Sequence, residues 1–73
     1  MEIGDRIREL RESQCLSLRE LARRSGMTPT GISLIEQGER KPSSITIEKL
    51  AHGLRVQPGE LFEIPLAGAS RRP

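Results

Sequence analysis

The sequence of 73 residues contains few of the residues from which disulfides, metal sites and catalytic centres are built. Its single cysteine, Cys15, excludes a disulfide within the chain and a metal site made of cysteines. Its single histidine, His52, has no second histidine or cysteine placed to share a metal, so we expect it to be a surface residue. The carboxylates are scattered rather than paired, so no enzyme activity, cofactor or metal is expected.

Long apolar runs and alternating patterns are also missing. No apolar run approaches the roughly 18 residues of a membrane span, and the charged start MEIGDRIREL is unlike a signal peptide. We therefore expect a soluble, cytoplasmic protein with no contact to a membrane. Polar and apolar residues nowhere alternate for long enough to form a strand, which predicts an all-α fold.

The size and charge of the chain set further limits. Seventy-three residues make one domain with a modest core, whose marginal stability a bound partner would increase. The 12 basic and 10 acidic residues leave a net charge of +2, which fits either a mixed solvated surface or a basic binding face. The position of the charges matters more than their sum, and one basic pair, Arg40-Lys41, lies between two expected helices.

Periodic apolar residues predict five short helices. Ile3, Ile7 and Leu10 form the buried stripe of a first helix over about 2–14. The next two helices begin at caps Ser17 and Thr28, and a fourth, capped by Ser43 or Ser44, runs to about 54. A fifth helix is expected over 58–63. Residues 1–64 would form the domain and residues 65–73, which are small and basic, a disordered tail.

The stretch LRELARRSGMTPTGISLIEQ, residues 18–37, is the most informative part of the sequence. It predicts two helices joined by a tight turn at Gly26, the second opening with Thr28-Pro29, where a missing N–H costs nothing. Ala22, Ile32 and Ile35 fall where a helix-turn-helix needs a small residue and two apolar contacts. That geometry presents one helix end to a DNA groove.

The chain resembles the phage-repressor and Cro-like helix-turn-helix domain, the XRE family, over about residues 3–62. The resemblance rests on IGDRIRELR, LSLRELARRSGM, PTGISLIEQGERKPS, TIEKLA and V-x-P-x-E-L-F, which occur in this order. It implies a lambda-repressor-like bundle of five helices that binds double-stranded DNA. It also implies a homodimer on a palindromic operator, with the third helix in the major groove and no small-molecule ligand.

The resemblance assigns the outward side chains of the third helix to base edges. These are Pro29, Thr30, Ser33, Leu34 and Gln37. Thr30 and Ser33 can donate to or accept from any base, so their readout is permissive. Leu34 stands where relatives commonly carry a polar residue, and it could pack on thymine methyl groups or be merely exposed. Gly31 within this helix fits either close approach of the backbone to DNA or a tolerant surface position.

Phosphate contacts are expected around the ends of the third helix. The candidates are Arg19, Thr28, Arg40, Lys41, Ser43 and Ser44. The glutamine that phage proteins often have at the start of the second helix is replaced by Leu18, so that contact is not expected. The family often pairs the positions of Arg11 and Glu36, each four residues after a buried isoleucine. We therefore predict a partly buried ion pair between them, with two solvated charges as the alternative.

The sequence departs from the family pattern at two helix ends. Cys15 stands where the family usually has glycine, and it would be strained if the position needs a positive φ. Near the end of the fourth helix, glycine has moved to Gly53, and Arg55 stands at the usual turn glycine. That region often carries the dimer contact, which makes Arg55, Pro58, Leu61 and Phe62 candidates for the interface.

The leading prediction is a small bacterial or phage transcriptional regulator of the repressor or controller type. Two alternatives stay open. The chain could be an antitoxin that binds its operator and also neutralises a toxin. It could instead be a protein-interaction module that has lost DNA binding, which the mild charge and Leu34 favour. RNA polymerase is a further possible protein partner.

Overall fold

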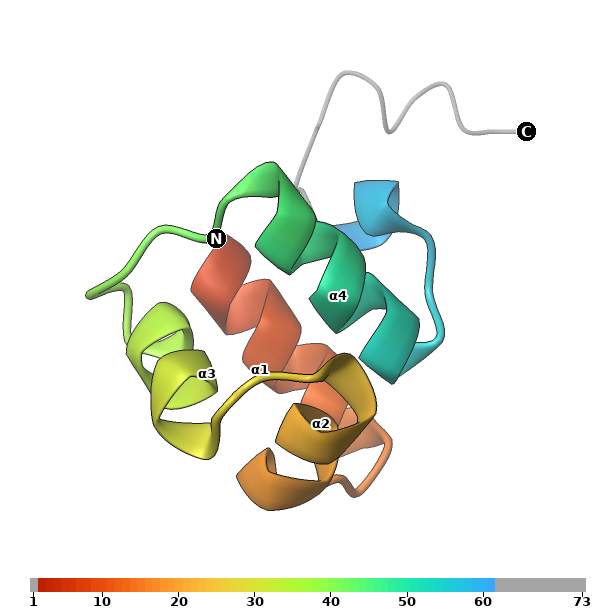
Figure 1. Cartoon of the computed structure of the whole chain (residues 1–73). Helices are drawn as coiled ribbons and strands as arrows, with labels where there is room; N and C mark the ends of the chain where they lie inside the picture. The colour runs from red at the N-terminus through yellow and green to blue at the C-terminus, as the bar shows by residue number, and fades with distance from the viewer. Residues whose placement is uncertain (1, 62–73) are drawn as a thin grey trace.

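The computed structural model describes residues 2–61, which form a helical domain (Figure 1). The elements are α1 (Ile3–Ser13), α2 (Leu18–Ser25), α3 (Pro29–Glu36), α4 (Ser44–Leu54) and a 3₁₀ turn η1 (Pro58–Leu61). α1 passes behind the centre of the view, with α3 on one side of it and α4 and η1 on the other. The predicted all-α fold is confirmed. Within residues 2–61 no helix is long and apolar enough to cross a membrane.

Side-chain caps fix where three of the helices begin, as the sequence predicts. The Ser17 hydroxyl accepts a hydrogen bond from the Glu20 amide at 3.0 Å, and the Thr28 hydroxyl accepts one from Gly31 at 3.0 Å. At α4 the choice between two serines falls on Ser43, whose hydroxyl accepts from the Thr46 amide at 3.2 Å. Each cap satisfies an amide that has no partner inside its helix.

The predicted fifth helix is wrong as an α-helix. The described chain has four α-helices, and Pro58–Leu61 form a single 3₁₀ turn instead. The Glu60 amide donates to the Gln57 carbonyl three residues back at 2.9 Å, which is 3₁₀ geometry, and the Glu60 carboxylate accepts from the Gln57 amide at 3.2 Å. The remainder of the predicted helix and the predicted tail over 65–73 lie outside the described residues.

Aliphatic side chains from every element form the core. The fully buried ones are Ile7, Leu21, Ile32, Ile35, Leu50, Leu54 and Leu61. Glycines allow two close helix contacts around it. A Cβ at Gly53 of α4 would lie 2.9 Å from Leu21 Cδ1 and 3.2 Å from Ser25 Cβ of α2. A Cβ at Gly4 of α1 would collide with the carbonyl oxygen of Ile35 at the end of α3.

The two helix ends at which the sequence departs from the family keep the conformation that glycine normally provides. Cys15 has φ 59° and Arg55 has φ 60°, both in the left-handed region. Arg55 ends α4, where its amide bonds the His52 carbonyl at 3.1 Å and the next amide, of Val56, bonds the Ala51 carbonyl at 3.0 Å. The helix ends at Leu54 as predicted, but at the energetic cost of a non-glycine residue in this region.

Candidate nucleic-acid interface

Most of the side chains predicted to read bases lie on the accessible side of α3. Pro29, Thr30 and Gln37 are exposed, whereas Ser33 and Leu34 are half-buried. The Gln37 amide Nε2 donates a 2.8 Å hydrogen bond to the Ser33 hydroxyl one turn earlier. Ser33 of α3 and Gln37, which directly follows the helix, therefore form one polar unit.

Unpaired backbone amides mark the beginnings of α3 and α4. Thr28 and Ser43 cap one amide each, through Gly31 and Thr46. Within residues 2–61, the amides of Thr30, Ser44 and Ile45 have no hydrogen bond acceptor, as expected for the first turn of a helix. Such amides attract phosphate oxygens.

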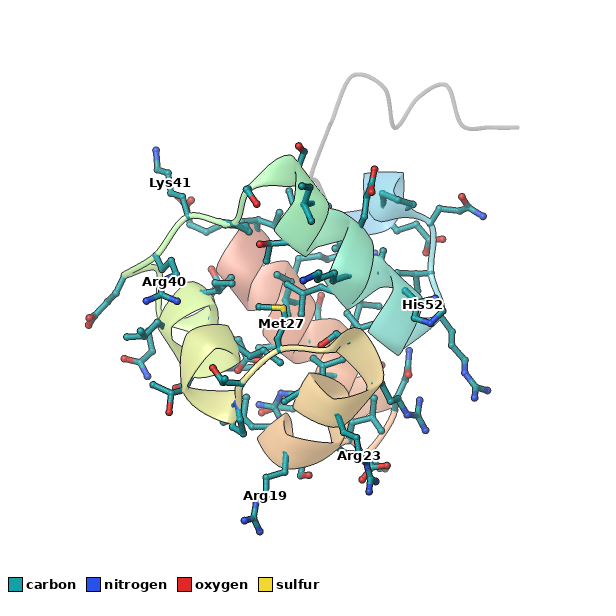
Figure 2. All side chains as sticks on the ribbon, in the orientation of Figure 1. Arg19, Arg23, Met27, Arg40, Lys41 and His52 are labelled. Carbon is teal, nitrogen blue, oxygen red and sulfur yellow. The ribbon has the colours of Figure 1, made fainter. Side chains whose placement is uncertain are left out.

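Arginine side chains lie on either side of α3. The Arg40 Nη1 atom would be only 3.6 Å from a Cβ at Gly31, so the guanidinium reaches back over the first turn of α3. Gly31 itself is buried, which is against a tolerant surface position. In Figure 2, Arg40 and Lys41 project from the loop beyond α3, and Arg19 projects from the start of α2. All three are exposed.

An ion-pair cluster ties α1 to the end of α3. Arg11 Nε lies 2.8 Å from Glu36 Oε2, and the side chains of Arg11 and Glu36 are 12% and 3% exposed. Arg11 Nη1 also donates to the Leu16 carbonyl at 2.9 Å. The hydrogen bond to Glu36 raises the pKa of Arg11 above its ordinary value, so the guanidinium stays charged. The structure thus brings together the two residues that the sequence paired.

A second arginine completes this cluster. Arg8 Nε lies 3.4 Å from Glu36 Oε1, and its side chain is 47% exposed. The sequence predicts only Arg11 as a partner of Glu36. Arg8 and Arg11 are three residues apart, however, and therefore share one face of α1. The buried carboxylate at the end of α3 is bound by one partly buried and one accessible guanidinium.

The candidate dimer residues have different environments. Arg55 and Pro58 are exposed, whereas Leu61 is fully buried in the core of its own chain. The Leu61 side chain therefore has no surface to offer a partner in this conformation. Phe62 lies outside the described residues.

Two further hydrogen bonds join the beginning of the chain to its C-terminal part, residues 54–60. The sequence predicts neither of them. Arg6 Nε donates to the Glu60 carbonyl at 3.0 Å, and Gln14 Nε2 donates to the Leu54 carbonyl at 2.7 Å. Both join residues at least 40 positions apart, so no local pattern in the sequence indicates them.

The arrangement of α2, the turn and α3 is that of a helix-turn-helix protein. A sequence model of the helix-turn-helix family matches residues 7–61, and the chain belongs to this family, in its XRE type. Proteins of this type are DNA-binding transcriptional regulators.

Two solved structures are similar to this chain. The restriction-modification controller protein C.AhdI from Aeromonas hydrophila is 42% identical, with a TM-score of 0.80 over 82% of this chain and 91% of that one. The clp gene regulator ClgR from C. glutamicum is 27% identical, with a TM-score of 0.78 over 96% of this chain and 88% of that one. These relatives share the fold over most of their lengths.

Curated relatives are longer. An uncharacterized HTH-type transcriptional regulator of Mycobacterium tuberculosis is 45% identical over 64 residues, which are 88% of this chain and 25% of the relative. The HTH-type transcriptional repressor RghR of Bacillus subtilis is 44% identical over 54 residues, 73% of this chain and 40% of RghR. The chain thus spans about a quarter of the length of the mycobacterial relative.

Proposed function

We propose that this chain regulates transcription as a homodimer that binds a palindromic operator in double-stranded DNA, with α3 in the major groove. The observation that carries the proposal is the accessible polar face of α3, formed by Thr30, Ser33 and Gln37. Basic side chains lie on either side of this face, and unpaired amides mark the beginnings of α3 and α4. The polar face suits base edges, whereas the basic side chains and the amides suit phosphates.

Within this proposal the base contacts and the phosphate contacts have different roles. Thr30, Ser33 and Gln37 hydrogen-bond base edges, while Pro29 and Leu34 add apolar contacts, including to thymine methyl groups. The phosphate ligands are Arg19, Thr28, Arg40, Lys41, Ser43 and Ser44. Because the amide groups at the beginnings of α3 and α4 are fixed by the backbone, they position the helix without reading sequence.

The dimer is proposed to form through the exposed surface around Arg55 and Pro58, with Phe62 as a further contact. A repressor or controller role is supported by the names of two relatives, a restriction-modification controller and a transcriptional repressor.

A binding titration with duplex DNA tests the proposal. The duplex comes from the region upstream of the protein's own gene, and a scrambled duplex of equal length is the reference. Specific binding that weakens steeply with salt is expected. Thr30→Ala combined with Ser33→Ala should abolish the preference for the specific duplex, at an expected cost of about 1–3 kcal/mol for each lost base contact.

Ser13→Ala is the matched control for this pair of substitutions. Ser13 is an exposed serine at the end of α1, whose hydroxyl bonds the Leu10 carbonyl of its own helix. This variant should bind DNA like the original chain. Failure to bind either duplex at low salt would contradict the proposal and favour a protein partner instead.

A further inference from the structure

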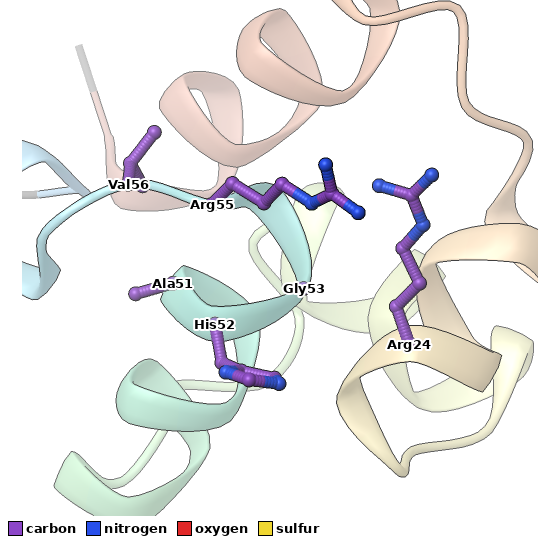
Figure 3. Close-up of a pocket in the computed structure, with 6 residues that line it drawn as sticks. All are labelled: Arg24, Ala51, His52, Gly53, Arg55 and Val56. Atoms are coloured by element: carbon purple, nitrogen blue, oxygen red, sulfur yellow. The ribbon is translucent and has the colours of Figure 1, made fainter.

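A pocket of about 450 Å³ lies between the C-terminal ends of α2 and α4. It is lined by Arg24, Ala51, His52, Gly53, Arg55 and Val56. Figure 3 shows that the guanidinium groups of Arg24 and Arg55 extend to the same side of it and point toward one another. Its volume is within the usual range for small-molecule sites, about 300–1,000 Å³.

Within residues 2–61 neither guanidinium group forms an ion pair. No carboxylate of this part of the chain lies within 4.0 Å of either group. Glu20, one helical turn before Arg24, is already engaged by Arg23, which lies 2.7 Å from both of its oxygens. The two side chains therefore bring two positive charges to one pocket, and these charges would attract an anion.

Hydrogen bonds to the carbonyl groups at the helix ends do not explain why the two guanidinium groups lie at this pocket. Lysine and arginine side chains often bond the last carbonyl groups of a helix, but here other donors occupy several of them. The Ala22 carbonyl accepts from the Met27 amide, the Ala51 carbonyl from Val56, and the Leu54 carbonyl from Gln14 Nε2 at 2.7 Å. Within residues 2–61 neither guanidinium donates a hydrogen bond to the protein.

The pocket is separate from the candidate DNA interface. His52, at its edge, lies on the opposite side of Figure 2 from Arg40 and Lys41, which follow α3. A ligand here would leave the α3 face uncovered. It would contact the end of α2 and the end of α4, the two helices that cross closely at Gly53.

We propose that Arg24 and Arg55 bind a phosphate group, either free or carried by a small molecule, in this pocket. Guanidinium groups suit phosphate because their planar donors match its oxygens two at a time. Ala51 and Val56 offer apolar contacts for the remainder of a larger ligand. The sequence alone predicts no small-molecule ligand, so the pocket is a departure from that expectation. The proposal does not depend on DNA binding.

The single histidine makes the test specific. Because the chain has one histidine, its imidazole gives one set of NMR signals, and these come from the edge of the pocket. Inorganic phosphate is titrated at constant ionic strength and constant pH, so that a change of the imidazole signals reports binding. A saturable shift of the His52 signals is expected, and its absence would overturn the proposal.

Three variants locate the binding. Arg24→Gln and Arg55→Gln should each weaken phosphate binding by about tenfold, the size expected for loss of one charge-assisted hydrogen bond. Arg40→Gln, on the α3 side, should leave the titration unchanged. An equal shift of the His52 signals in Arg24→Gln and Arg55→Gln would refute the site.

A further titration separates a free phosphate ligand from a DNA phosphate. If phosphate shifts the His52 signals equally in the presence of bound duplex, the ligand is a separate small anion, as proposed. If duplex DNA alone shifts them to the same end point, and Arg24→Gln prevents this, the phosphate that binds is the DNA backbone, and the proposal of a separate small anion is overturned. No response of the His52 signals to either would overturn the proposal while leaving DNA binding through α3 intact.

Discussion

Glu36 carries a buried negative charge at the end of α3, compensated by Arg11 and Arg8 of α1. A buried carboxylate requires such compensation, because the loss of its hydration is expensive. The carboxylate also holds Arg11, whose other nitrogen bonds the Leu16 carbonyl. One residue therefore fixes α3, α1 and the segment that follows α1 relative to one another.

Glu36→Gln is expected to lower the free energy of unfolding by about 3–5 kcal/mol, because it leaves Arg11 without its nearest counter-charge in a mostly buried position. Urea denaturation followed by circular dichroism measures the change. Glu9→Gln is the control, since the Arg6–Glu9 pair is exposed, and it should cost less than about 1 kcal/mol. A loss below about 0.5 kcal/mol for Glu36→Gln would show that the pair contributes little.

The sequence indicates some of these contacts and not others, for a physical reason. The pairing of Arg11 with Glu36 can be predicted, because the positions fall beside the buried faces of two expected helices. The contact of Arg8, and those of Arg6 and Gln14 with the C-terminal part, depend on how the helices cross. Crossing angles follow from packing of the whole core, which no local pattern contains.

At the scale of the helix, local sequence predicts where a helix begins and ends better than it predicts which helices are in contact. Ser17, Thr28 and Ser43 are predicted as caps because a cap involves only the next three residues. The left-handed residues that end helices are also local, which is why the strain expected at Cys15 corresponds to its φ of 59°. The 3₁₀ form of η1 was missed, because four residues carry no periodicity.

Cys15→Gly is expected to stabilise the fold by about 1 kcal/mol, because glycine adopts the left-handed conformation without the steric cost that other residues have there. Thermal and urea unfolding of the reduced protein measure it. Cys15→Ala is the control: it removes the thiol but keeps a Cβ, so stability should hardly change. Equal effects of both substitutions would mean that the thiol, and not the backbone, causes the difference.

Gly53→Ala is expected to destabilise the fold by about 1 kcal/mol or more, since crowding between α2 and α4 outweighs the better helix propensity of alanine. The added Cβ would lie 2.9 Å from Leu21 Cδ1. Gly59→Ala is the control, because nothing lies within 4 Å of its added Cβ, and it should be neutral or slightly stabilising. Comparable urea midpoints for the two variants would contradict a close crossing at Gly53.

At the scale of the whole molecule, the small net charge of +2 conceals a favourable distribution. Arg19, Arg40 and Lys41 lie around α3, whereas Glu36 is buried and neutralised. With the exposed Glu39 of the same loop counted, these side chains still leave an excess of positive charge near α3. Composition alone leaves the partner open, and the position of the charges in the fold supports DNA.

Arg40→Gln tests this view of the molecule. If Arg40 contacts one phosphate, the substitution should reduce the slope of log affinity against log salt concentration by about 1 and weaken all duplexes alike. The measurement is a fluorescence titration at several salt concentrations. Arg6→Gln is the control, because Arg6 bonds the Glu60 carbonyl on the η1 side. An unchanged slope in Arg40→Gln would exclude the phosphate contact.

The left-handed position at Cys15 has a practical consequence for spectroscopy. The thiol is exposed and belongs to the chain's only cysteine, so a maleimide dye or nitroxide will attach at one defined point. The neighbouring Gln14 bonds Leu54 at the end of α4, which places the label beside the proposed dimer region rather than over α3. Distances between two such labels would report how two copies assemble, and would do so both in free solution and on an operator.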